Sequence, residues 1–125
     1  MKNLIALTFL VALFFCSNNK SLPQHYSSPY KDTLIDSSSG ERFYLDTSLI
    51  YVSAFDKSGN LIWKTDPWKD NNLGEYRVKR PKIRYFGFER DKRTDNIEVI
   101  GISYNNSQFG YLDKLTGKFT FLGQD

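Results

Sequence analysis

Few residues of this 125-residue chain are of types that carry out chemistry. It has one cysteine, Cys16, and one histidine, His25, and both precede the first pattern typical of a folded domain. His25 lies in a polar, serine-rich stretch that cannot bury enough surface to become ordered, so no Cys–His or Ser–His–Asp arrangement can be built around it. The motifs C-x-x-C and H-E-x-x-H do not occur, and neither do glycine-rich phosphate loops. We therefore expect neither nucleophilic catalysis nor a bound metal or cofactor.

Carboxylates remain as candidate catalytic groups, because a glycoside hydrolase needs only two of them. The acids that could pair in this way are Asp46, Asp66, Glu75, Glu89 and Glu98. Most of them fall in turns or at strand positions expected to face solvent, and 14 acids in 125 residues is an ordinary number. The sequence favours a non-catalytic protein, with a hydrolase that uses paired carboxylates as an alternative.

The longest segment without a strand pattern in the second half of the chain is residues 66–81, DPWKDNNLGEYRVKRP. It contains four residues of the types that dominate binding interfaces, namely Trp68, Tyr76, Arg77 and Arg80. Long loops in compact domains are often functional, so this loop predicts a surface for a partner. The alternative is that Trp68 and Tyr76 fold inward and cover one open end of a sheet.

A run of basic residues continues beyond this loop. Lys82 and Arg84 would share one face of a strand and could contact anionic lipid headgroups, sugars or an acidic protein. A solvated face is the commoner outcome for such a run. The formal net charge of the chain is only +3, which does not by itself predict a nucleic-acid partner.

The first 15 residues have the pattern of a signal peptide. Lys2 supplies a positive charge, and residues 4–15 read LIALTFLVALFF. As a helix this apolar run would be about 18 Å long, against about 30 Å for a bilayer core, so it predicts a signal peptide rather than a membrane span. We therefore expect an exported protein, and export separates it from nucleic acid.

Residues 13–16, LFFC, resemble the lipobox of bacterial lipoproteins, in which a leucine stands three residues before a cysteine. Leu13 and Cys16 are those residues here. The residue before the cysteine is usually Gly, Ala or Ser in that family, and this chain has Phe15. The resemblance implies that Cys16 becomes the first mature residue and carries a lipid, which would hold the protein at the periplasmic face of a bacterial membrane. The alternative is ordinary secretion.

Residues 16–40 are serine-rich and polar, and we expect them to form a flexible tether. Such a tether would span roughly 27 Å on average, which suits a domain held just off a membrane surface. The short apolar patch at residues 34–36 could add a strand or a turn.

From residue 41 onward, apolar and polar residues alternate between turns, which is the pattern of β-strands. We predict strands at residues 42–46, 49–55, 61–65, 82–88, 97–104, 108–112 and 118–122. No window of helical length keeps the spacing of an amphipathic helix. We therefore predict a single all-β domain, residues 41–125, with about seven antiparallel strands. Two meanders, at 42–65 and 82–122, would form a small sandwich or an open barrel around the aromatic residues.

Two of the predicted hairpins are alike: residues 51–65 read YVSAFDKSGNLIWKT, and residues 109–123 read FGYLDKLTGKFTFLG. In each, an aspartate can accept hydrogen bonds from turn amides and a glycine allows a positive φ. These residues are Asp56 and Gly59 in the first hairpin, and Asp113 and Gly117 in the second.

The first hairpin resembles a blade hairpin of the quinoprotein-type (PQQ-like) β-propellers, which have a recurring Ala, Asp, Gly and Trp. Those positions are held here by Ala54, Asp56, Gly59 and Trp63. The second hairpin departs from the pattern, because Leu112 precedes its aspartate and Phe121 stands in the Trp position. A closed propeller needs at least about four blades of roughly forty residues, more than residues 41–125 can supply, so we expect neither a closed propeller nor a quinone cofactor.

Together these patterns predict an exported, lipid-anchored cell-envelope protein that binds an envelope protein or a glycan and does not catalyse a reaction. An immunity-type or inhibitor protein, which would block a toxin or an enzyme with residues 66–81, is one alternative. An envelope hydrolase with paired carboxylates is the other.

Overall fold

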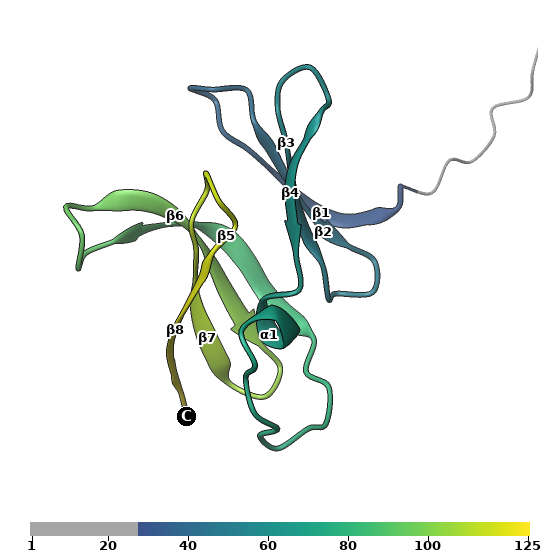
Figure 1. Cartoon of the computed structure of the whole chain (residues 1–125), viewed down its shortest axis with the longest axis vertical. Coiled ribbons are helices and arrows are strands. Elements are labelled where there is room, and N and C mark those ends of the chain that lie inside the picture. Colours follow the sequence, from purple (N-terminus) through teal and green to yellow (C-terminus); the bar gives the residue numbers. More distant parts are fainter. Residues whose placement is uncertain (1–27) are drawn as a thin grey trace, which may run out of the picture.

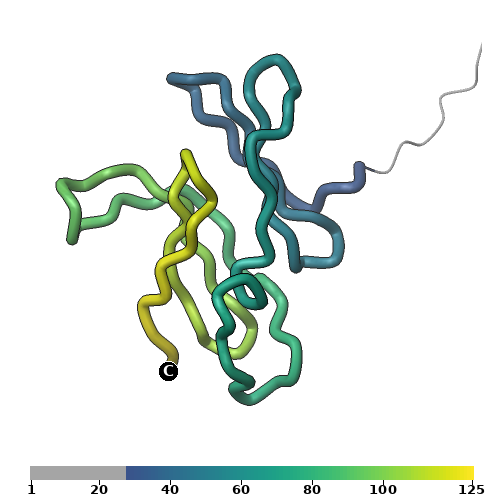
Figure 2. Tube along the Cα trace, viewed as in Figure 1, coloured from purple at the N-terminus to yellow at the C-terminus, as the bar shows by residue number. Residues whose placement is uncertain are grey.

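The computed structural model describes residues 28–125 (Figure 1). The predicted signal peptide (1–15), Cys16 and His25 lie outside the described residues, so their assignments stay predictions. The described chain enters at the edge of one sheet and ends on another (Figure 2).

Eight antiparallel strands form two four-stranded sheets, each a simple meander in sequence order (Figure 1). The first sheet contains β1 (Tyr30–Ile35), β2 (Arg42–Asp46), β3 (Val52–Phe55) and β4 (Leu61–Thr65). The second contains β5 (Ile83–Asp91), β6 (Ile97–Tyr104), β7 (Gln108–Leu112) and β8 (Phe119–Gln124). The predicted all-β class and the two meanders are confirmed, and the sheets remain open rather than closing into a barrel.

β1 is the strand that the sequence pattern missed. We placed residues 16–40 in a flexible tether and allowed a strand or turn only at residues 34–36; residues 30–35 form a strand, so the tether assignment is wrong there. The strand shows no buried-exposed alternation, and only its Leu34 packs against the core. β1 is held instead by its backbone pairing with β2 and by the Tyr30 ring, which stacks on Tyr44 at 4.2 Å. An edge strand held in this way needs no apolar periodicity of its own, and so periodicity could not reveal it.

One hydrophobic core lies between the two sheets. The first sheet contributes Phe43, Leu45, Val52 and Ala54, which are at most 4% exposed. The second contributes mainly Ile83, Ile100, Ile102, Tyr104, Leu112 and Phe119. The ring of Phe43 bridges the sheets, because its centroid lies 6.0 Å from that of Trp63 on β4 and 5.9 Å from that of Phe88 on β5. The alternation that predicted β2 therefore points Phe43 and Leu45 into this core, as expected.

A short helix, α1 (Pro67–Asp70), begins the connection between the sheets. The carboxylate of Asp66 caps it by accepting a hydrogen bond from the Lys69 amide at 3.1 Å, and proline occupies the first turn, where its missing N–H is not needed. Across residues 28–125, no helix has the length and apolar character that a membrane crossing requires.

Each of the two similar hairpins turns between an aspartate and a glycine, and the second turn is one residue longer. The Gly59 amide donates to the Asp56 carbonyl at 3.0 Å, and the Gly117 amide donates to the Asp113 carbonyl at 2.9 Å. Both glycines have positive φ, +87° and +72° respectively. The side-chain carboxylate of each aspartate accepts further turn amides, at 2.7–3.0 Å. The roles predicted for these four residues are confirmed.

Candidate functional site

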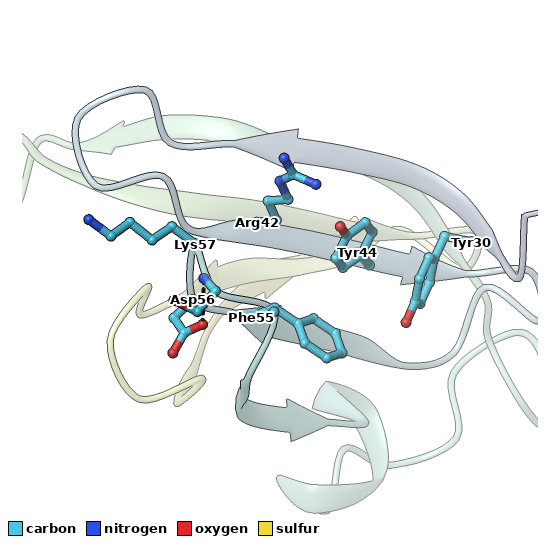
Figure 3. Close-up of a pocket in the computed structure, with 8 residues that line it drawn as sticks. Tyr30, Arg42, Tyr44, Phe55, Asp56 and Lys57 are labelled. Carbon is cyan, nitrogen blue, oxygen red and sulfur yellow. Dashed lines mark hydrogen bonds between the residues drawn. The ribbon is translucent and has the colours of Figure 1, made fainter.

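The outer face of the first sheet carries a hollow of about 320 Å³ with aromatic and charged walls (Figure 3). We call it the aromatic hollow. Its lining residues are Tyr30 from β1, Arg42 and Tyr44 from β2, Phe55 from β3, and Asp56, Lys57, Ser58 and Gly59 from the following turn.

The alternation of β2 places this surface opposite the core. Phe43 and Leu45 are buried between the sheets, so Arg42 and Tyr44 point to the other face. Phe55 reaches the same face, because it is the β3 partner of Arg42. The alternation that buries every second residue of β2 in the core therefore also places the residues between them on the surface, where they line the hollow.

Three rings lie in a row along the hollow (Figure 3). Tyr30 and Tyr44 stack with centroids 4.2 Å apart, and Tyr44 meets Phe55 edge-to-face with centroids 5.5 Å apart. Each ring is packed against a neighbour before any ligand arrives, so binding would immobilise little further side-chain freedom. Rigid aromatic surface of this kind is what binding sites use for contact area.

The charges around the hollow are not balanced. Within residues 28–125, Arg42 and Lys57 are exposed and neither forms an ion pair. The one acid in the lining, Asp56, is used by its own turn, and hydrogen bonds from Asn60, backbone first, hold the pKa of its carboxyl below the usual range. The hollow therefore offers apolar ring surface beside two cations that are available to an anionic group.

Two of the residues predicted to bind a partner, Trp68 and Arg80, are engaged within the fold. The Trp68 ring packs against the core, and its Nε1 donates to Gln108 Oε1 at 3.2 Å. Arg80 forms an ion pair with Asp66, and its guanidinium lies 4.8 Å from the centroid of the Trp68 ring. The inward placement considered as the alternative for Trp68 is what the structure shows.

The other two, Tyr76 and Arg77, lie farther along the loop. The Tyr76 hydroxyl donates to the Asp125 carbonyl, and the Arg77 guanidinium lies 4.9 Å from the centroid of the Tyr76 ring. Arg77 is exposed and has a positive φ of 63°. The four residues thus form two pairs. Trp68 and Arg80 contact the fold and hold the loop, whereas Tyr76 and Arg77 lie near the C-terminal residue Asp125. Partner binding by this loop stays a prediction.

Two of the acids considered for a hydrolase, Asp46 and Asp66, have separate partners. The carboxylate of Asp46 accepts from Ser48 Oγ at 2.5 Å and from backbone amides, while Asp66 is paired with Arg80. The others are Glu75 in the loop, Glu89 on β5 and Glu98 on β6. In the part of the chain that the structure describes, no group of three or more His, Cys, Asp or Glu side chains is placed to hold a metal ion.

A charge cluster of three residues joins the sheets, and no sequence pattern predicted it. Lys114 Nζ, after β7, donates to Asp36 Oδ2 at 2.5 Å and to Glu98 Oε1 at 2.8 Å. The hydrogen bond from Lys114 holds the pKa of the Asp36 carboxyl well below its usual range. Because Asp36 lay in the predicted tether, no local pattern connected it to a lysine 78 positions away.

The aromatic hollow was also missed, since Tyr30 belongs to the strand assigned to the tether. No family model, curated protein or solved structure matches this chain. Function is therefore inferred from its own residues, and the aromatic hollow is the feature most like a binding site.

Proposed function

We propose that this protein is an exported, lipid-anchored cell-envelope protein that binds a partner through the aromatic hollow. The partner is an envelope protein or a glycan. The observation that carries the proposal is the row of three contacting rings on a solvent-facing sheet surface. It is flanked by Arg42 and Lys57, which form no ion pair within residues 28–125.

Exposed aliphatic residues extend this surface across the sheet. One cross-strand row runs from Ile35 through Arg42 and Phe55 to Leu61. Ile35 is 57% exposed and Leu61 is 56% exposed, which is unfavourable for large apolar side chains in water. Exposed large apolar side chains close to a cation are typical of a binding face.

The aromatic hollow predicts the effect of removing its central ring. Tyr44→Ala removes both ring contacts of the row, and we expect the affinity of the purified chain for its target in isolated envelope fractions to fall at least about tenfold. The measurement is a binding isotherm with wild-type and variant chains. Tyr85→Ala is the matched control, because Tyr85 is 43% exposed and lies on the second sheet. Equal losses for both variants, or no loss for Tyr44→Ala, would rule out the hollow as the binding site.

The anchor is proposed from the lipobox resemblance, with Cys16 standing 14 residues before the first residue of β1, Tyr30. Cells that express the wild-type chain should incorporate labelled palmitate into it, and Cys16→Ala should abolish the label, because Cys16 is the only thiol in the chain. Phe15→Ala, which gives the residue preferred in lipoboxes, should keep or increase the label. Label that persists in Cys16→Ala, or is absent from the wild type, contradicts lipidation.

An immunity-type or inhibitor protein is the second candidate, and the exposed part of the 66–81 loop favours it. Arg77, Val78 and Lys79 are consecutive and exposed, with Val78 at 41%. In the same binding assay, a loss with Arg77→Ala but none with Tyr44→Ala would favour this candidate over the aromatic hollow.

A further inference from the structure

The second sheet contains a seat for an aromatic side chain, and the first sheet fills it. Trp63 on β4 reaches the turn between β7 and β8, where its Nε1 donates to the Lys114 carbonyl at 2.9 Å. The indole lies directly on Gly117, since a Cβ at that glycine would come within 2.6 Å of the ring. The seat therefore consists of a glycine floor and a backbone carbonyl that accepts the indole N–H.

The turn between β3 and β4 has the same order of residues, Asp-Lys followed by a glycine of positive φ. Lys57 follows Asp56 as Lys114 follows Asp113, and Gly59 and Gly117 both have positive φ. The turn at Gly59 is one residue shorter, because its amide donates to the carbonyl three residues before it and the Gly117 amide donates to the carbonyl four residues before it. Here, however, the seat is empty. A Cβ at Gly59 would meet nothing within 4 Å, and no hydrogen bond to the Lys57 carbonyl occurs within residues 28–125.

The empty seat forms one end of the aromatic hollow. Lys57 and Gly59 line that hollow, together with Phe55, which stands directly before the turn aspartate. In the second sheet the residue in that place, Leu112, is buried in the core between the sheets. The outer face of the first sheet is therefore equivalent to the face of the second sheet on which Trp63 is seated.

We propose that the aromatic hollow receives a tryptophan side chain of a partner protein. The indole would lie over Gly59, against Phe55, and its N–H would donate to the Lys57 carbonyl. This inference rests on the proposed function, because it names the partner class of the same site: a protein, rather than a glycan, that presents an exposed tryptophan.

The filled seat also indicates the charge of the partner. The sheet that supplies Trp63 supplies Asp36 as well, and Asp36 binds Lys114 of the seat at 2.5 Å. The corresponding Lys57 is exposed and has no ion pair among residues 28–125. A partner that reproduces the contact presents a carboxylate near its tryptophan, which complements the positive rim of the hollow.

A second copy of the chain does not fit these requirements. Its second sheet would present β8, where Phe121 has the sequence position of Trp63 and carries no N–H donor. The aspartate before its β5–β6 turn, Asp91, is already paired with Arg93 at 3.0 Å. The proposed occupant is therefore a different protein that carries a carboxylate near its exposed tryptophan.

The test uses the full chain and N-acetyltryptophanamide as the probe. We expect saturable binding to the wild type, seen as shifts of the Phe55, Lys57 and Gly59 amide resonances, and at least about tenfold weaker binding of N-acetylphenylalaninamide. Gly59→Asn should reduce binding of the tryptophan probe at least about tenfold while leaving the melting temperature unchanged, because asparagine tolerates positive φ and its side chain would occupy the seat. Gly74→Asn is the control, since a Cβ there also meets nothing within 4 Å.

Equal affinity for both probes, or full affinity in a folded Gly59→Asn chain, would overturn the inference. So would self-association of the wild type that Phe121→Ala abolishes, because a second copy would then occupy the seat. The proposed function is tested by a different variant, Tyr44→Ala, so the two claims can fail independently. If Tyr44→Ala weakens binding to the envelope target and Gly59→Asn does not, the hollow binds its partner without a seated tryptophan.

Discussion

Replacing Trp63 with alanine should lower the free energy of unfolding by about 3 kcal/mol. This side chain connects the sheets through its ring contact with Phe43, its packing on Gly117 and its hydrogen bond to the Lys114 carbonyl. Its removal leaves a cavity in the shared core and an unpaired carbonyl. A small domain has only about 5–15 kcal/mol in total, so the variant should be close to the limit of stability. Urea unfolding followed by circular dichroism measures the change.

Trp63→Phe is the matched variant, because it keeps an aromatic ring against the core and removes the N–H donor. We expect it to cost about 1 kcal/mol, the typical net value of one hydrogen bond. Tyr85→Ala, at an exposed position on the second sheet, should change stability by less than about 0.5 kcal/mol. A Trp63→Ala variant as stable as Tyr85→Ala would show that this contact does not hold the sheets together.

Replacing Lys114 with methionine should cost about 3 kcal/mol at neutral pH. Asp36 is only 8% exposed, and Lys114 is its sole ion-pair partner within residues 28–125, so the variant leaves a nearly buried carboxylate without a cation. Lys118→Met is the control, because Lys118 lies in the same hairpin, is exposed and has no ion pair in the described part of the chain. Equal unfolding free energies for the two variants would contradict a stabilising role for the charge cluster.

The same cluster makes stability depend on pH. Lys114 lowers the pKa of Asp36 in the folded state, so the unfolded chain binds a proton at this carboxyl more readily than the folded one. The stabilisation is fully present above about pH 4, the ordinary aspartate range, and is lost as the pH falls through the lower folded-state pKa. Unfolding free energies measured between about pH 7 and pH 2 should therefore decrease more steeply for the wild type than for Lys114→Met.

Local chemistry in the sequence was sufficient to predict the turns and one face of the core. Asp56 and Gly59 act within one short turn, and the alternation of Phe43 and Leu45 needs only the strand period. Both predictions concern residues within a few positions of one another. Propensity and periodicity are informative at that range, and so these predictions were confirmed.

The aromatic hollow could not be predicted in the same way. It needs β1, whose exposed residues carry no strand period, and it needs the pairing that brings Tyr30 beside Tyr44. That pairing includes a register shift between Tyr30 and Asp32, which no local pattern encodes. The rings belong to separate strands and form a surface only after the sheet is assembled.

The seat for Trp63 shows the same limit over a longer range. The two similar hairpins were visible in the sequence, including the aromatic residue on the second strand of each. The contact between the two hairpins joins Trp63 to Lys114, which lie 51 positions apart. Only the packing of the two sheets shows that the seat at Gly117 is filled and that the one at Gly59 is empty. The loop residue Trp68 was misleading for a related reason, since its partner Gln108 lies 40 positions away.

The most direct test of the central claim compares Tyr44→Ala with Tyr85→Ala in binding to isolated envelope fractions, with both chains shown to be folded by their melting temperatures. If the aromatic hollow is the binding site, Tyr44→Ala loses at least about tenfold in affinity and Tyr85→Ala binds as the wild type does. If Tyr44→Ala binds as tightly as the wild type, the protein does not act through this face of its first sheet.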